Sequence, residues 1–138
     1  MVTLPRPHLD EIVAHAREHR DQEVCGVLGG RPSQVDRVIR ARNTAETPRT
    51  RFEMDSRDIF SALRSIENED MDLIGFYHSH THTQAYPSPT DVAMWSDTWG
   101  AEALCFICSL MEEDRPVLRA FRIDHEGRVT EESISIEE

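Results

Sequence analysis

Apolar residues recur along this chain at two different spacings, and the two spacings predict two kinds of element. A spacing of three or four residues predicts helices over residues 7–19 and 56–68, the second capped by Asp55. Short apolar or alternating runs predict strands, separated by turns at 30–33, 112–116 and 124–127. The predicted strands span residues 24–29, 35–41, 72–78, 104–111, 117–123 and 129–136. An extended piece at 51–54 and a third helix from Thr90 complete the prediction.

Strands and helices in this order predict an α/β fold in which helices flank a mixed sheet. The expected core face of the second helix consists of Ile59, Leu63 and Ile66. With 138 residues, 38% of them hydrophobic, the chain is expected to form a single domain over residues 1–138. No apolar run is long enough for a signal peptide or a membrane span, so a cytoplasmic location is expected.

The charge of the chain narrows the range of its partners. The formal net charge is −11, and every basic residue apart from histidine is arginine. A surplus of negative charge disfavours nucleic acid and anionic membranes as partners. It weakly favours a protein partner with a basic face.

The candidate chemistry is concentrated at the end of the strand over 72–78. His78 and His80 are two residues apart, so on a strand both side chains point to the same face. After a loop, Ser88 and Pro89 begin the third helix, and Asp91 in its first turn is able to reach back to the histidines. Two histidines and one carboxylate leave a fourth position for water, as in a catalytic zinc site.

Each of these features also has an ordinary structural interpretation. A lone His-x-His on a strand is weak evidence for a metal. Ser88 and Asp91 also form a capping box, in which the acidic residue suits a helix N-terminus. The combination favours the metal site, because Glu23 lies directly before another predicted strand and supplies a carboxylate for proton transfer.

The full pattern of an upstream Glu and His-x-His-x7-Ser-x2-Asp resembles the JAMM, or MPN-plus, family of zinc metallopeptidases. The resemblance covers essentially the whole chain and implies the MPN/JAMM architecture, which is similar to that of cytidine deaminases. It implies one zinc ion per chain with His78, His80 and Asp91 as ligands, Glu23 as general base and acid, and Ser88 as a donor to the oxyanion. The residues around the motif look most like small bacterial members, several of which act on ubiquitin-like sulfur-carrier proteins.

Three other features are candidates for chemistry. His15 and His19 fit the His-x-x-Glu-His pattern of another zinc-peptidase class, but they flank the apolar stripe of the first helix as boundary residues do. Cys105 and Cys108 lie in a predicted strand, where residues three apart face opposite ways, and both are interpreted as core thiols. His82 shares strand parity with His80, yet it is expected in the loop beyond the strand, near the substrate channel.

The sequence therefore predicts a zinc-dependent peptidase or isopeptidase that cuts an amide bond at the C-terminal tail of a ubiquitin-like or sulfur-carrier protein. Such a tail is able to add as a strand to a sheet edge beside the metal. The short connections favour a small leaving group over a second folded protein. A non-catalytic MPN-type scaffold and a metallohydrolase of another substrate class, such as a phosphoesterase, stay open as alternatives.

Overall fold

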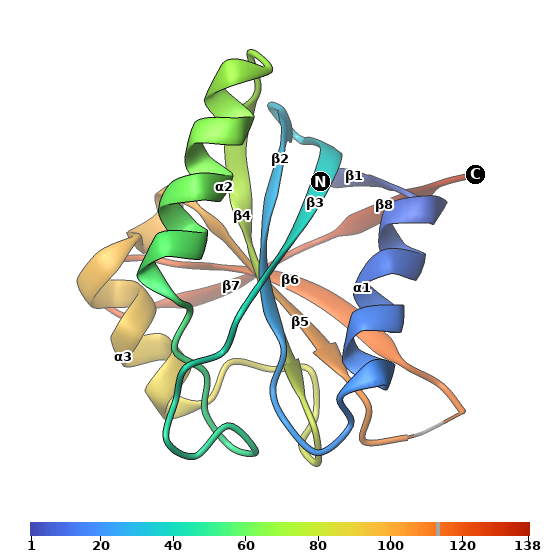
Figure 1. Cartoon of the computed structure of the whole chain (residues 1–138), viewed down its shortest axis with the longest axis vertical. Helices are drawn as coiled ribbons and strands as arrows, with labels where there is room; N and C mark the ends of the chain where they lie inside the picture. Colours follow the sequence, from blue (N-terminus) through green and yellow to red (C-terminus); the bar gives the residue numbers. More distant parts are fainter. Residues whose placement is uncertain (113) are drawn as a thin grey trace.

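Figure 1 shows the protein as a computed structural model, which describes residues 1–112 and 114–138. Within these residues, eight strands form one sheet in the order β7-β6-β5-β4-β2-β3-β1-β8. The strands are β1 (Val2–Pro5), β2 (Cys25–Arg31), β3 (Gln34–Ala41), β4 (Asp72–His80), β5 (Leu104–Ser109), β6 (Val117–Ile123), β7 (Val129–Glu132) and β8 (Ile134–Glu137). The helices are α1 (Arg6–Glu18), α2 (Ser56–Asn68) and α3 (Pro89–Thr98), followed by a short 3-10 helix at Gly100–Glu102.

Helices cover both faces of the sheet, with α1 on one face and α2 and α3 on the other (Figure 1). Ile12 of α1 packs in a buried cluster with Tyr77 and Phe106. On the opposite face, Trp95 of α3 contacts Phe76 edge to face. The predicted mixed sheet flanked by helices is therefore confirmed. No helix in the described part of the chain is both long and apolar enough to cross a membrane.

The second helix has the predicted bounds and the predicted cap. The Asp55 side chain accepts hydrogen bonds from the backbone N–H groups of Arg57 and Asp58. The predicted core face needs a correction, because Ala62 and Ile66 are the buried residues of α2, while Ile59 and Leu63 are half-buried. The buried face of α2 therefore includes the small residue Ala62, which the predicted face did not contain.

The two ends of the chain depart most from the prediction. The strand β1 was not predicted, and the strand predicted over 129–136 is divided into β7 and β8. These two strands lie at opposite edges of the sheet, and β8 pairs in parallel with β1. The pairing joins segments from the two termini, which a local periodicity does not encode. At the first turn, β2 continues to Arg31, so only residues 32–33 form the turn.

The strand β4 lies inside the sheet, with β2 antiparallel to it on one side and β5 parallel to it on the other. Gly26 of β2 lies directly opposite Tyr77. A Cβ atom on Gly26 would lie 2.2 Å from the Tyr77 ring, so only glycine leaves room for this ring to cross β2. The Tyr77 hydroxyl thereby reaches Nδ1 of His15 on α1, at 2.7 Å.

Candidate metal centre

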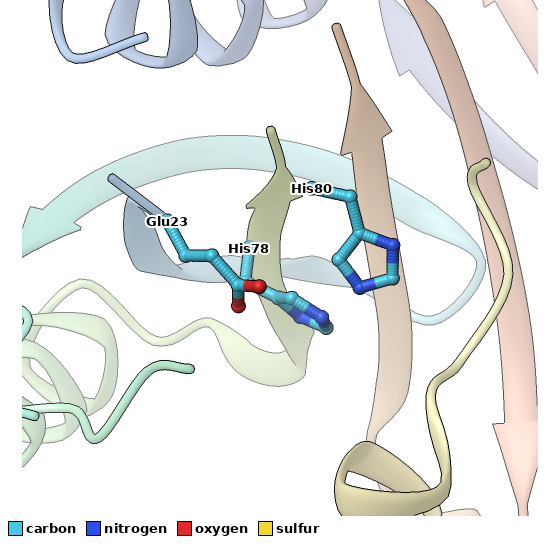
Figure 2. Close-up of side chains that lie close together, drawn as sticks. All are labelled: Glu23, His78 and His80. Atoms are coloured by element: carbon cyan, nitrogen blue, oxygen red, sulfur yellow. The ribbon is translucent and has the colours of Figure 1, made fainter. Parts of the chain in front are cut away.

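The site begins at the C-terminal end of β4, where His78 and His80 project from the same face of the strand (Figure 2). Both imidazoles are buried, with ring centroids 5.1 Å apart. This arrangement follows from the two-residue period of a strand and matches the prediction. The strand continues two residues further than predicted, so both histidines belong to it.

Pairing between β2 and β4 brings Glu23 to the same place. Cys25 lies opposite His78 in this ladder. Just beyond it, the Val24 N–H donates to the Ser79 hydroxyl at 2.8 Å, and the Ser79 N–H donates to the Val24 carbonyl at 3.0 Å. Ser79, which lies between the two histidines, therefore holds the backbone next to Glu23 in place. The buried Glu23 carboxylate points toward His78 (Figure 2).

Asp91 reaches the histidines from the first turn of α3. Its N–H donates to the Ser88 hydroxyl at 3.0 Å, and its Oδ2 accepts from the Ser88 N–H at 3.0 Å, which completes a capping box. The same Oδ2 lies 3.0 Å from Nε2 of His78 and 3.1 Å from Nε2 of His80. The capping box thus aims the carboxylate at both imidazoles.

Both ring nitrogens of His80 face an oxygen acceptor. Its Nδ1 lies 2.8 Å from the Gln84 carbonyl oxygen, which is only an acceptor, so Nδ1 carries a proton. In a neutral ring Nε2 then presents a lone pair to the Asp91 carboxylate, and two acceptors at this distance need a proton or a cation between them. Of the buried side-chain atoms in the described chain, Nδ1 of His78 has no hydrogen-bond partner.

The two carboxylates of the site differ in their affinity for protons. Burial alone would raise the pKa of Asp91, but the charge of His78 and hydrogen bonds with both histidines outweigh it and hold that pKa well below its usual value. Burial raises the pKa of Glu23 to about 7, with the Asp91 charge adding to the effect and His80 opposing it. One carboxylate therefore stays ionised at neutral pH, while the other is suited to exchange protons.

Two sets of donor atoms are available to a metal. The ligand atoms of Glu23, His78 and His80 all lie within 4.8 Å of one another. The Asp91 Oδ2 is closer to both histidines, at 3.0 and 3.1 Å. Bond lengths of about 2.0–2.1 Å separate the donors of a tetrahedral zinc site by roughly 3.3 Å. We therefore favour Asp91 as the third ligand, because it has the shorter spacing and the lower pKa.

A segment over residues 43–55 closes over these side chains, and sequence reasoning missed its contribution. The Phe52 ring stacks on His78, with centroids 4.3 Å apart. The Asn43 amide donates to the carbonyls of Glu23 and Arg51, and its oxygen accepts from the N–H groups of Ala45 and Glu53. The predicted extended piece at 51–54 was the one local signal for this segment.

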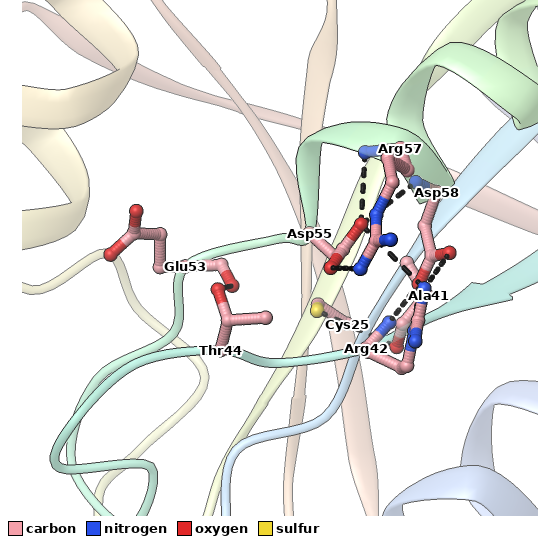
Figure 3. A network of polar contacts seen from close by, with 8 residues as sticks. All are labelled: Cys25, Ala41, Arg42, Thr44, Glu53, Asp55, Arg57 and Asp58. Carbon is pink, nitrogen blue, oxygen red and sulfur yellow. Dashed lines mark hydrogen bonds and ion pairs between the residues drawn. The ribbon is translucent and has the colours of Figure 1, made fainter.

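The base of this segment is held by ion pairs (Figure 3). Arg42 pairs with the Asp58 carboxylate at 2.9 Å and lies near Asp55. Arg57 also approaches Asp55. The Thr44 hydroxyl donates to the Glu53 carbonyl, which joins the beginning of the segment to its end. The segment is thus anchored where it leaves β3 and where it enters α2.

The remaining candidate residues lie elsewhere. His15 contacts the Tyr77 hydroxyl, and Glu18 pairs with Arg40, so the first-helix pattern is engaged in structural contacts. Cys105 and Cys108 belong to the two opposite core clusters, as predicted. His82 lies in the loop after β4, where its Nε2 accepts from Arg49 Nη2 at 2.9 Å.

The family of this chain follows from comparison with known proteins. Residues 5–124 match the family model described as prokaryotic homologs of the JAB domain. The chain belongs to this family. The resemblance to JAMM metallopeptidases drawn from the motif is confirmed at this level, and with it the hydrolase class.

Individual JAB-family relatives are similar over different lengths. The CysO-cysteine peptidase of Mycobacterium tuberculosis is 37% identical over 94% of this chain and 87% of that protein. The probable TtuB-protein conjugate cleaving protease of Thermus thermophilus is 36% identical over 67% of this chain and 63% of that protein. The solution structure of DSY2949 from Desulfitobacterium hafniense is 34% identical, with a TM-score of 0.87 over 100% of this chain and 94% of that one.

Proposed function

We propose that this JAB-family chain is a zinc-dependent peptidase that hydrolyses an amide bond at the C-terminal tail of a ubiquitin-like or sulfur-carrier protein. The observation that carries the proposal is the Asp91 oxygen shared by His78 and His80, with the proton-exchanging Glu23 within 4.8 Å of both histidines. We further propose that residues 1–138 act as one domain, in the cytoplasm.

The donor set fits one zinc ion per chain. His78, His80 and Asp91 would hold the metal, because two imidazoles and a carboxylate are ligands that zinc prefers. The convergence of both Nε2 atoms on one Asp91 oxygen, at 3.0 and 3.1 Å, supports this donor set. When bound, zinc supplies a Lewis acid that polarises the scissile carbonyl and makes water more acidic.

Two other residues would perform the proton transfer and the charge stabilisation. Glu23 takes a proton from the attacking water and later gives it to the departing amine, for which a pKa of about 7 is well matched. Ser88 is half-buried at the start of α3, and its oxygen accepts from the Asp91 N–H. Its hydroxyl hydrogen is therefore available to the oxyanion of the tetrahedral intermediate.

The names of the relatives support a carrier-type substrate. One is named for CysO-cysteine and the other for a TtuB–protein conjugate, so the two differ in the group that leaves. The tail cannot add to β4, because both edges of that strand are paired. A groove of about 480 Å³ lies beside the site between the 43–55 segment and α3, lined in part by Phe52, Thr90 and Met94, and we assign the tail to it.

Mass spectrometry of the products tests this function. Zinc-loaded wild type and Glu23→Gln are incubated with carrier proteins that bear C-terminal extensions after Gly-Gly. We expect cleavage after the Gly-Gly tail by wild type and a loss of at least about 100-fold in Glu23→Gln. Glu67→Gln, which removes an exposed carboxylate on α2, is the matched control. Equal cleavage by wild type and Glu23→Gln would refute the mechanism.

A metal count separates the peptidase from the alternatives. We expect one zinc per wild-type chain and none in Asp91→Ala. Absence of zinc from wild type after loading would favour the non-catalytic scaffold. Two metals per chain would favour a phosphoesterase-like site, because such enzymes commonly use two ions.

A further inference from the structure

The residues Pro48 and Arg49 lie across the Glu23 side of the site. The Glu23 N–H donates to the Pro48 carbonyl at 2.6 Å. The Thr81 hydroxyl, one residue beyond β4, donates to the Arg49 carbonyl at 3.1 Å. These two bonds attach the same dipeptide to the backbone of the acid–base residue and to the end of the histidine strand. The Arg49 side chain therefore begins at the rim of the site, beside Glu23.

The exposed Arg49 guanidinium has a histidine as its hydrogen-bond partner. Its Nη2 donates to Nε2 of His82 at 2.9 Å. Since arginine is only a donor, His82 accepts through Nε2 and keeps its proton on Nδ1. Among the described residues, no carboxylate pairs with Arg49, although the chain has a net charge of −11. Other arginines, such as Arg42 and Arg119, pair with acidic side chains.

The chemistry of the proposed function places the leaving group next to this cation. Glu23 gives its proton to the departing amine, so the residue that contains this amine lies on the Glu23 side. If that residue is the last of its chain, its α-carboxylate is attached to the same carbon as the amine. A guanidinium binds a carboxylate through two parallel N–H···O bonds, which gives both affinity and orientation.

We propose that Arg49, held in place by His82, binds the α-carboxylate of the leaving residue, so that the site selects a single C-terminal amino acid attached to the carrier tail. This proposal rests on the peptidase function and adds the class of leaving group to it. A second folded protein joined through a lysine side chain presents no carboxylate at this position. The site therefore discriminates against such conjugates.

A matched pair of substrates tests the role of Arg49. Both carry one amino acid after the Gly-Gly tail of a carrier, ending in an α-carboxylate in one and in an α-carboxamide in the other. We expect wild type to prefer the carboxylate by about 10-fold in kcat/KM, as one charge-assisted contact provides, mainly through a lower KM. Arg49→Gln should cleave the two substrates at equal rates. Arg49→Lys should retain part of the preference, because lysine keeps the positive charge but lacks the two parallel N–H donors of the guanidinium.

Two additional measurements exclude a purely structural effect of the substitutions. Arg64→Gln removes another exposed arginine, on α2, and should keep the full preference. Binding of the two substrates to zinc-free Glu23→Gln, measured by calorimetry, should show the same 10-fold preference, which adding Arg49→Gln abolishes. High salt should weaken binding of the carboxylate substrate more than that of the carboxamide.

The outcomes distinguish this proposal from the function on which it rests. Equal cleavage of both substrates by wild type would overturn the role of Arg49 and leave the peptidase intact. A preference that persists in Arg49→Gln would overturn it too. Failure of wild type to cleave either substrate would overturn both proposals together.

Discussion

Asp91 takes part in two interactions that the sequence presents as alternatives. It completes the capping box of α3 with Ser88, and its Oδ2 also faces both imidazoles. The two roles are compatible because a carboxylate oxygen accepts more than one hydrogen bond. At the scale of single residues, the cap fixes the direction of the oxygen that faces both imidazoles.

Ser88 is expected to contribute separately to catalysis and to stability. Ser88→Ala removes both the helix cap and the donor to the oxyanion, so kcat should fall by about 100- to 1,000-fold and unfolding free energy by about 1 kcal/mol. Ser88→Gly removes the same hydroxyl but costs only about a few tenths of a kcal/mol as a cap. Steady-state kinetics and urea unfolding of both variants check this. A wild-type kcat in Ser88→Gly would show that the hydroxyl has no catalytic role.

His15 should make the stability of the protein depend on pH. Burial lowers the pKa of His15 to about 4, with the charges of Arg40 and His19 adding to the effect. Between the ordinary value of 6.5 and about 4, the unfolded chain therefore binds a proton that the folded chain does not. The stability contributed by neutral His15 is complete above pH 6.5 and is lost as the pH falls through this window.

Comparison with His15→Gln isolates this contribution. Glutamine keeps a polar partner for the Tyr77 hydroxyl but does not titrate. From pH 7 to pH 5, the unfolding free energy of wild type should fall by about 1–2 kcal/mol more than that of His15→Gln. Urea unfolding at a series of pH values measures the difference. Parallel pH curves for the two proteins would contradict the prediction.

At the scale of elements, the strands and helices with strong local patterns were predicted well. The bounds of α2 and β6 agree with the prediction. The strand β3 begins one residue earlier than predicted, and α1 both begins and ends one residue earlier. The Asp55 cap was identified because its chemistry is local. The strand β1 was missed because four residues carry too little periodicity, and because its neighbours β3 and β8 are distant in sequence.

Gly26 is expected to be essential for the packing of β2 on β4. Gly26→Ala places a methyl group 2.2 Å from the Tyr77 ring, which is fully buried and has little room to move. The substitution should lower the unfolding free energy by about 1–3 kcal/mol, as overpacking of a core does. In a Tyr77→Ala background it should cost much less, because the ring is absent. An equal cost in both backgrounds would exclude the clash as the cause.

At the scale of the whole molecule, the candidate metal site joins distant parts of the chain. His78 and His80 end β4, Asp91 begins α3, and Glu23 precedes β2. The unfolded chain holds none of these groups together, so zinc should bind the folded state selectively. Each tenfold rise in free zinc above the Kd should stabilise the fold by about 1.4 kcal/mol.

Thermal unfolding with and without zinc measures this coupling. We expect Tm to rise with zinc in wild type and to stay constant in Asp91→Asn, which keeps the shape of the side chain but weakens it as a ligand. Asp97→Asn changes an exposed carboxylate on the same helix and should respond like wild type. An equal rise of Tm in Asp91→Asn would place the stabilising metal elsewhere.

The nature of the candidate chemistry could be predicted from local patterns in the sequence. The spacing of His78 and His80 put both on one face of a strand, and the Ser88–Asp91 pattern put a carboxylate in the first turn of a helix, because these periods are local properties of the backbone. The family of the chain also followed from this pattern and from Glu23. The roles of the five motif residues stay predictions.

The arrangement of these residues in space depends on the packing of the whole fold. The bonds of Ser79 to Val24 bring Glu23 beside the histidines, and the 43–55 segment places Phe52 on His78 and Arg49 at the rim. The same structure paired β4 on both sides and thereby removed the sheet edge expected for a substrate tail. Contacts between residues distant in the chain depend on the packing of whole elements, and local spacing carries no information about that packing.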